Sequence, residues 1–455
     1  MTIFRRSYRS IAYYTLLVGL ILSVSGCNST KKAIVSTVGK TAEGGNIALP
    51  CKLSDDQAAS TADTKSKIVL TLDGSGSMVG YAKDANSSYI QMLKLLDRVS
   101  LANPGGVEYA RIDTNRKSIS RTEFQQAFTP AFYTGQMSKI ADAFPDSKAV
   151  KGEQLLAIVT DLQPDDGDVN LVSKRILEDY LKKDGYAVAV WGIKSEFDGN
   201  VYPPNNAPAY PYSSKSADRG RPFYIILAGR YEAIADFAKT IRSQDSSFLK
   251  GKSQLTIFTP DRSIATASYL TPSQDNLPKG VTSPTSLSQE RFEIDSGEQP
   301  VQLLEFGENS NPDHQSLKYS LNYQPNPDTT FPTQLEPKYE VHKYNGDLNK
   351  PEFAVINSTK LFDLTSSLAD NKLSVEAKFD PTKIESGLYY LTVDLTATGI
   401  NTPQVWADWN DRGRKDGAKT QGLSDFLDSL SINTTTVMKE KPPVAARLCY
   451  GIQRD

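Results

Sequence analysis

The sequence lacks the residues on which several common kinds of chemistry depend. Its 455 residues include only three cysteines, which excludes a disulfide-stapled scaffold and a Cys-rich zinc module. Two histidines, His314 and His342, argue against His-rich metal sites and against a hydrolase with a histidine base. The formal net charge is −2, so no global attraction to nucleic acid is expected. We therefore expect no nucleic-acid partner.

The N-terminus has the pattern of a bacterial secretory signal peptide. Arg5, Arg6 and Arg9 precede a mostly apolar stretch, residues 11–24, which is too short and too N-terminal for an ordinary membrane span. Small residues and a cysteine follow, in Val24-Ser25-Gly26-Cys27. A basic head, an apolar middle and a small-residue cleavage site predict export.

Cys27 stands where it resembles the lipidated cysteine of a bacterial lipobox. The resemblance implies removal of a signal peptide, residues 1–26, and acylation of Cys27. Several acyl chains, at about 0.8 kcal/mol per buried methylene, would then hold the protein in the membrane. Asn28 follows the cysteine, which favours the outer over the inner membrane of the bacterial envelope. A soluble export signal or a single anchoring helix is the alternative.

Composition divides the remaining chain into three parts. Residues 27–65 are rich in Ser, Thr, Lys, Ala and Gly, which predicts a flexible tether. Residues 66–244 alternate buried-strand patterns such as Lys67–Leu72 with helical periodicity such as Ser87–Leu101, which predicts an α/β domain with a mostly parallel sheet covered on both faces. Residues 250–455 carry many short strand patterns, starting at Gln254–Thr259, which predict a β-rich and sandwich-like region.

Within the C-terminal region, two segments have the composition of short helices. They are Leu361–Ala369 and Leu423–Leu430.

The most informative residues follow the first predicted strand, in Asp73-Gly74-Ser75-Gly76-Ser77. Ligands bind at the carboxyl ends of strands in open α/β sheets. Alternate residues here supply one carboxylate and two hydroxyls, and the glycines allow a sharp turn. Hard oxygen donors of this kind suit Mg²⁺, with Mn²⁺ or Ca²⁺ as substitutes. A polar Gly/Ser loop without a ligand is the alternative.

This segment resembles the von Willebrand factor type A domain, with its metal-ion-dependent adhesion site. The resemblance covers about Ser66–Arg242 and implies a doubly wound, Rossmann-like fold. The family's loop threonine matches Thr134, with Thr129 as the competing residue, and its strand-end aspartate matches Asp161. Leu162 stands where the family usually has glycine.

The resemblance also implies roles for these residues. Ser75, Ser77 and Thr134 would coordinate the metal, with Thr134 bound directly or through water. Asp73 and Asp161 would hold coordinated waters and neutralise charge. One coordination position would take an Asp or Glu carboxylate from a protein partner.

Other polar and aromatic residues near this site have two interpretations each. Asp165, Asp166 and Asp168 suggest either an additional Ca²⁺ site or an acidic loop that caps a helix. Three tyrosines either line the rim of the metal face or pack against the sheet: Tyr81, Tyr89 and Tyr133. The segment Ser195–Arg221 is either an accessory contact surface or a plain surface loop.

After lipidation of Cys27, Cys51 and Cys449 are the two cysteines that remain. Export permits a disulfide between them. Their separation along the chain leaves the pairing open.

Three functions compete on the sequence alone. The favoured one is a non-enzymatic, membrane-anchored adhesion protein. The second is an assembly subunit of an envelope complex whose metal site is vestigial. The third is an exported serine hydrolase, which the sequence disfavours because Gly74-Ser75-Gly76 does not fit Gly-x-Ser-x-Gly.

Overall fold

The structure is a computed structural model of the 455-residue chain. It describes residues 39–41, 46–47, 51, 66–144, 153–163, 168–203, 207–215, 219–244, 246–264, 268–270, 277–278, 280–289, 292–295, 301–307, 316–322, 326–345, 352–356, 362–369, 372–413 and 415–454. The signal peptide, Cys27, Asp165, Asp166 and His314 lie outside this part of the chain. Within it, no helix is long and apolar enough to cross a membrane.

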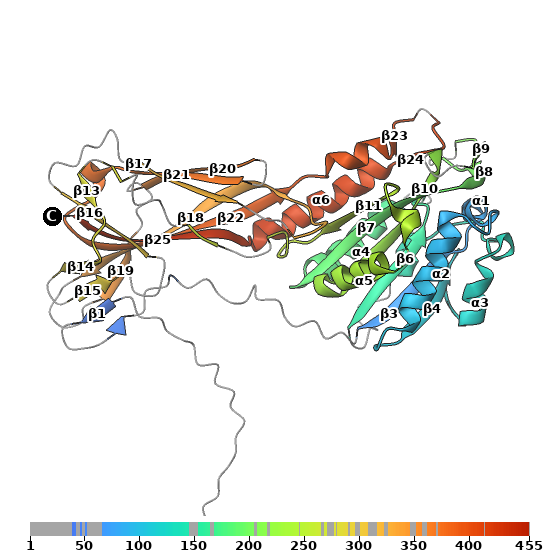
Figure 1. Ribbon diagram of the computed structural model, residues 1–455, viewed down its shortest axis with the longest axis horizontal. Coiled ribbons are helices and arrows are strands. Elements are labelled where there is room, and N and C mark those ends of the chain that lie inside the picture. The colour runs from blue at the N-terminus through green and yellow to red at the C-terminus, as the bar shows by residue number, and fades with distance from the viewer. Residues whose placement is uncertain are drawn as a thin grey trace, which may run out of the picture. The chain divides into compact units, whose positions relative to one another are not determined.

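The α/β part is built on a sheet of seven strands, here called the first sheet, in the order β11-β7-β10-β6-β3-β4-β5 (Figure 1). The strands are β3 (Lys67–Asp73), β4 (Val107–Ile112), β5 (Arg116–Ile119), β6 (Gln154–Thr160), β7 (Tyr186–Ser195), β10 (Arg221–Arg230) and β11 (Ser253–Phe258). β3, β4, β6 and β7 run in one direction, and β5, β10 and β11 run in the opposite direction. The expected α/β class is confirmed, and the expected parallel pairing is found at the centre, where β3 pairs with β4 and β6.

β10 enters the first sheet antiparallel, between β6 and β7. In its described part the connection from β7 contains no α-helix; it contains the hairpin of β8 (Phe197–Val201) and β9 (Tyr210–Ser214). Without a crossover helix the chain turns straight back, so Arg221 lies opposite Ser195. The expected plain surface loop at residues 195–221 is therefore wrong in its described part, and the N-terminal end of β10 lies at the edge where β3 and β6 end.

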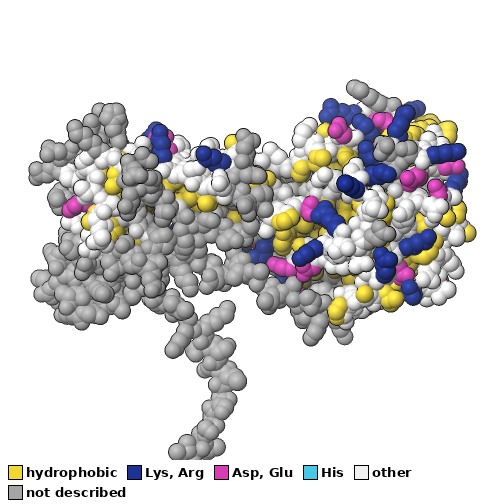
Figure 2. Space-filling view, in the orientation of Figure 1, with side chains coloured by type: hydrophobic (Ala, Val, Ile, Leu, Met, Phe, Trp, Pro, Cys, Tyr) yellow, Lys and Arg dark blue, Asp and Glu magenta, His cyan; other side chains and the backbone are white. Residues whose placement is uncertain are grey.

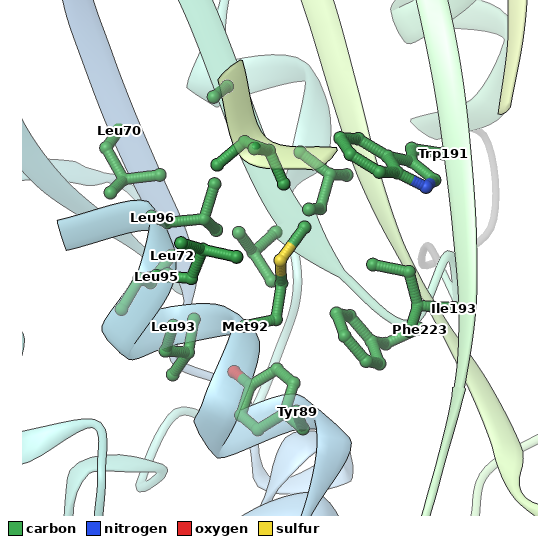
Figure 3. Packing of buried hydrophobic residues seen from close by; sticks show 14 of the residues in the cluster. Leu70, Leu72, Tyr89, Met92, Leu93, Leu95, Leu96, Trp191, Ile193 and Phe223 are labelled. Carbon is green, nitrogen blue, oxygen red and sulfur yellow. The ribbon is translucent and has the colours of Figure 1, made fainter. Parts of the chain in front are cut away.

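Helices cover both faces of the first sheet, as expected. On one face lie α2 (Ser88–Leu101) and α5 (Tyr231–Ser243), whose apolar residues pack with the sheet in one cluster. Figure 3 shows Tyr89, Met92, Leu93, Leu95 and Leu96 of α2 in one packed cluster with Leu70, Leu72, Ile193 and Phe223. Ser87 caps α2 by accepting a bond from the Ile90 amide (3.2 Å).

The other face is covered by α4 (Asp168–Ile176) and by α6 (Leu423–Glu440), which comes from the C-terminal region. Residues of α6 such as Phe426 and Leu430 share a buried cluster with Ile158 and Val190 of the first sheet. β11 was expected in the β-rich region but pairs with β7. The predicted short helix at 423–430 is confirmed and extends further.

Short elements complete this part of the chain. They are α1 (Val79–Ala82), α3 (Arg121–Gln126), the 3-10 turns Gly76–Met78, Pro130–Phe132, Ile140–Ala143, Ser247–Leu249 and Gln404–Asp408, the π-helical turn Leu177–Leu181, and the strand pair β23 (Asn410–Asp411) and β24 (Thr420–Gln421). Of the segment that follows Thr134, only Ile140–Ala143 is helical, as a 3-10 turn.

The C-terminal region is β-rich, as expected. A second sheet has the order β13-β16-β25-β22-β18-β19, with β12 beside β25, and a three-stranded sheet has the order β17-β21-β20. Their strands are β12 (Ser268–Tyr269), β13 (Val281–Thr282), β16 (Val301–Phe306), β17 (Ser316–Asn322), β18 (Pro332–Asn345), β19 (Glu352–Ile356), β20 (Phe362–Ala369), β21 (Lys372–Phe379), β22 (Gly387–Ile400) and β25 (Val444–Arg454). One buried cluster joins the two sheets. The helix expected at 361–369 is wrong, because this segment is strand β20.

A small sheet fixes the N-terminal segment to this region. β1 (Gly39–Thr41) pairs with β2 (Asn46–Ile47) and β15 (Phe292–Asp295), which pairs with β14 (Ser286–Gln289). Cys51 then forms a disulfide with Cys449 of β25, and both are buried. The segment expected to be a flexible tether is thus paired and cross-linked in its described parts.

Charged side chains of both signs are interspersed over the visible face of the α/β part (Figure 2).

The Cys51–Cys449 bridge closes a sequence separation of 398 residues. Replacing Cys449 by Ser is expected to lower the free energy of unfolding by about 2–5 kcal/mol, because the cross-link restricts the unfolded chain. Urea unfolding of the full chain measures this. Cys51→Ser should lose as much, and the double variant no more than either. Equal stability of wild type and Cys449→Ser would contradict the prediction.

Candidate metal centre

The site begins at the carboxyl end of β3, where a tight turn places two serine hydroxyls together. The Ser75 amide donates to Asp73 Oδ1 (2.9 Å), and the two hydroxyl oxygens of Ser75 and Ser77 lie 3.0 Å apart. Gly74 is required here, since a Cβ atom would lie 2.2 Å from Nε of Arg111. The turn therefore presents adjacent hydroxyls above a buried carboxylate.

Backbone hydrogen bonds join the segment of Thr134 to this turn. The Gly135 amide donates to the Gly74 carbonyl (2.9 Å), and the Gly76 amide donates to the Gly135 carbonyl (2.8 Å). Thr134 is exposed, and its hydroxyl accepts a bond from the guanidinium of Arg111 (3.0 Å). The competing Thr129 instead donates to the carbonyl of Gln126.

Asp73 is fully buried and accepts hydrogen bonds from three segments. Besides the Ser75 amide, its Oδ2 accepts from the hydroxyls of Ser138 (2.6 Å) and Thr160 (2.8 Å). Burial raises the pKa of the Asp73 carboxyl, and the bonds from Ser138, Ser75 and Thr160 oppose that rise. Sequence reasoning missed the roles of Ser138 and Thr160. The position of Thr160, directly before the predicted site residue Asp161, could have indicated its role. No local sequence pattern indicated a role for Ser138.

Asp161 follows the end of β6 and is also buried. Its Oδ1 accepts a bond from the Gln163 amide (3.3 Å), while Oδ2 has no hydrogen-bond partner among the described residues. Burial raises its pKa to about 6, the charge of Arg221 lowers it, and the charge of Asp73 raises it again. The hydroxyl of Ser77 also lowers this pKa, so Asp161 faces the serines of the β3 turn.

Leu162 has a backbone conformation that favours glycine. Its φ is 53°, in the left-handed region, and its side chain is buried. Its amide donates to the Thr160 hydroxyl (3.2 Å). The loop after β6 therefore keeps a glycine-like path, at a conformational cost of about 1–3 kcal/mol.

The other residues singled out in the sequence have different surroundings. Tyr81, Tyr89 and Tyr133 are buried, and the hydroxyls of Tyr89 and Tyr133 lie 2.9 Å apart. The rim interpretation of these tyrosines is wrong, and the packing one is confirmed. Asp168 begins α4, and its side chain lies outside the description. His342 contacts Glu340 within β18 (3.1 Å).

Two arginines that sequence reasoning did not single out border the site. Arg111 of β4 contacts Thr134 and donates to the Gly74 carbonyl (3.3 Å). Arg221, at the start of β10, places its guanidinium 4.0 Å from Asp161 Oδ2. Neither had a motif that could reveal it, since antiparallel insertion of β10 brings Arg221 here.

The donors are suited to a small hard cation. Two buried carboxylates form the floor, and hydroxyls at half-buried and exposed positions (Ser77 and Thr134) form the open side. The unpartnered Oδ2 of Asp161 can accept from a metal-bound water, which Mg²⁺ usually retains. In the described part of the chain, no cluster of three or more His, Cys, Asp or Glu side chains forms, and a cation held here would need hydroxyl ligands as well as carboxylates.

Comparison with known proteins adds no assignment: no family model, curated protein or solved structure matches this chain.

The hydrogen bonds to Asp73 give a testable expectation for stability. Ser138→Ala and Thr160→Val each remove one donor to a buried carboxylate, so each should lower the free energy of unfolding by about 1–3 kcal/mol. Urea denaturation of the full chain measures the loss. Thr129→Val is the matched control, because its bond is local and exposed. A loss no greater than that of the control would show that these bonds do not support the site.

Proposed function

We propose that the chain is a membrane-anchored lipoprotein that binds protein partners in a divalent-cation-dependent way, through a site of the von Willebrand factor type A kind. The observation that carries the proposal is that three separate segments, which carry five oxygen-bearing side chains, meet at one edge of the first sheet. Asp73, Ser75 and Ser77 share one turn, Thr134 joins it through backbone bonds, and Asp161 lies beyond the neighbouring strand.

The residues have distinct roles in this proposal. Ser75, Ser77 and Thr134 would hold the cation through their hydroxyls, while Asp73 and Asp161 would accept from its waters and balance its charge. Bound Mg²⁺, Mn²⁺ or Ca²⁺ would supply a Lewis-acid position for the Asp or Glu carboxylate of a partner. Because both acids are buried and Asp73 is held by three hydrogen bonds, the turn is arranged before any ligand arrives.

Membrane attachment rests on the sequence alone. Cys27 would carry the lipid, and placement in the bacterial envelope, with the outer membrane favoured, follows from Asn28. A doubly wound connectivity of the α/β part also belongs to the proposal. The central strands β3, β4 and β6 support it.

A second function, assembly of an envelope complex without metal, is favoured by one observation. The guanidinium of Arg111 donates a hydrogen bond to the Thr134 hydroxyl, and the guanidinium of Arg221 faces the Asp161 carboxylate. Positive charge at both places allows the site to persist without a cation. Partner binding that is unaffected by chelator would support this function.

The hydrolase interpretation receives no support from the contacts of Ser75. Its hydroxyl lies beside that of Ser77, and His342 contacts Glu340 in a different sheet. A covalent serine probe that labels Ser75 would revive it.

Calorimetric titration of the purified full chain with Mg²⁺ and Mn²⁺ tests the proposal. The wild type should bind one ion, and Asp73→Ala, Ser75→Ala and Thr134→Ala should each weaken or abolish binding, because each removes an oxygen donor of the site. Thr129→Ala is the control and should bind as the wild type does. Absence of binding to the wild type, or equal loss with the Thr129 variant, would contradict the proposal.

The open coordination position gives a separate expectation. With Mn²⁺ bound, an Asp-containing peptide should reduce the water-proton relaxation enhancement by displacing water from the ion, and the same peptide with Asn should not. An equal effect of both peptides would show that a carboxylate is not what the ion recognises.

A further inference from the structure

Arg221 is a fully buried arginine at the edge of the candidate site. Its side chain is 1% exposed, and the side chain of Asp161, which it faces, is equally buried. Arg221 reaches this place because β10 runs antiparallel to β6 and β7, so its N-terminal end meets the carboxyl ends of β3 and β6. Buried charges are costly unless they are paired, so this pair needs an explanation.

The guanidinium of Arg221 is held back from the carboxylate. The separation of 4.0 Å between NH2 and Asp161 Oδ2 is too long for a hydrogen bond. NH1 instead donates to the carbonyls of Gly417 (3.2 Å) and Lys419 (3.4 Å), and the guanidinium lies over the ring of Phe197 (5.5 Å). Nε and NH2 of Arg221 have no hydrogen-bond partner among the described residues.

The segment that holds Arg221 comes from the C-terminal region. Thr420 lies in it, and its hydroxyl bonds that of Tyr224 in β10 (2.8 Å). Gly417 packs so closely on Tyr212 of β9 that a Cβ atom would lie 2.2 Å from the ring. The segment 417–420 is therefore held by Tyr212 of β9 at one end and by Tyr224 of β10 at the other.

We propose that Arg221 sets the cation affinity of the site, and that the segment 417–420 controls this by holding the guanidinium away from Asp161. The proposal rests on the metal site proposed above. Arg221 supplies a positive charge beside Asp161 when no cation is bound, and this charge opposes a divalent cation. Because the segment retains NH1, Oδ2 of Asp161 stays free to accept from a metal-bound water.

The effect of removing the charge follows from electrostatics. The guanidinium and the Asp161 carboxylate are opposite charges 4.0 Å apart in a buried place, so each favours the charged form of the other. Without Arg221 the buried Asp161 carboxylate loses a compensating charge, so the metal-free protein becomes less stable and a cation gains more by binding.

Calorimetric titration of the full chain with Mg²⁺ tests the proposal. Arg221→Met should bind Mg²⁺ about tenfold more tightly than the wild type, or more. Arg242→Met is the matched control, because Arg242 of α5 is paired with Asp328 (2.6 Å). The Mg²⁺ affinity of this variant should equal that of the wild type. Equal or weaker binding by folded Arg221→Met would overturn the proposal.

A second variant tests the role of the segment while keeping Arg221. Tyr224→Phe removes the bond to Thr420, so the segment loosens, the guanidinium can close on Asp161, and Mg²⁺ affinity should fall. If the Mg²⁺ affinity of Tyr224→Phe is unchanged, the segment 417–420 does not regulate cation binding and this part of the proposal is overturned.

A metal-free measurement separates this inference from the proposed function. In chelator, thermal unfolding of Arg221→Met, Asp161→Asn and the double variant should be non-additive, with the double variant melting above Arg221→Met. Additive losses would overturn the pairing of Arg221 with Asp161. Suppose that the losses are non-additive and that Arg221→Met binds Mg²⁺ while the wild type does not. This result would support the role of Arg221 and would refute the proposed function. If the wild type binds Mg²⁺ but the losses are additive, the proposed function would be supported and the role of Arg221 would be refuted.

Discussion

The buried carboxylate of Asp73 is the constraint on which the site depends. A buried carboxylate is stabilised by hydrogen bonds to its oxygens, and for Asp73 those bonds come from the turn itself, from Ser138 and from Thr160 of β6. Satisfying this one group therefore draws together three segments that are far apart along the chain. The serine hydroxyls and Asp161 owe their positions to that convergence.

The C-terminal region is part of the same unit as the first sheet. α6 covers one face of that sheet, β11 extends its edge, and the segment 417–420 contacts Arg221 at the candidate site. These contacts place residues of the C-terminal region directly at the edge of the candidate site. At the other end of the region, β1 and the Cys51–Cys449 bridge attach the N-terminal segment to β-rich structure. The N-terminal segment is therefore joined to the β-rich region before the chain enters the α/β part.

The sequence predicted features that depend on local pattern. The apolar run of β3 and the periodicity of α2 gave their positions, and Asp73-Gly74-Ser75-Gly76-Ser77 marked the turn. It could not predict the antiparallel β10, because a strand pattern contains no direction and the connection after β7 looked like a surface loop. It predicted a short helix at 361–369, whereas pairing with β21 makes residues 362–369 a strand.

Within the site, the division is similar. Residues in a motif were found, whereas Ser138, Arg111 and Arg221 were not, because each is brought to the site by tertiary pairing alone. Among them Arg221 places a buried positive charge 4.0 Å from Asp161 Oδ2.

The most direct measurement is a crystal of the full chain soaked in Mn²⁺ and recorded at a wavelength where manganese scatters anomalously. The account predicts one anomalous peak about 2.1–2.2 Å from the hydroxyl oxygens of both Ser75 and Ser77, close to the distances hard cations of this size adopt. A map without a peak at these serines, with the Arg221 guanidinium bonded directly to Asp161, would contradict it.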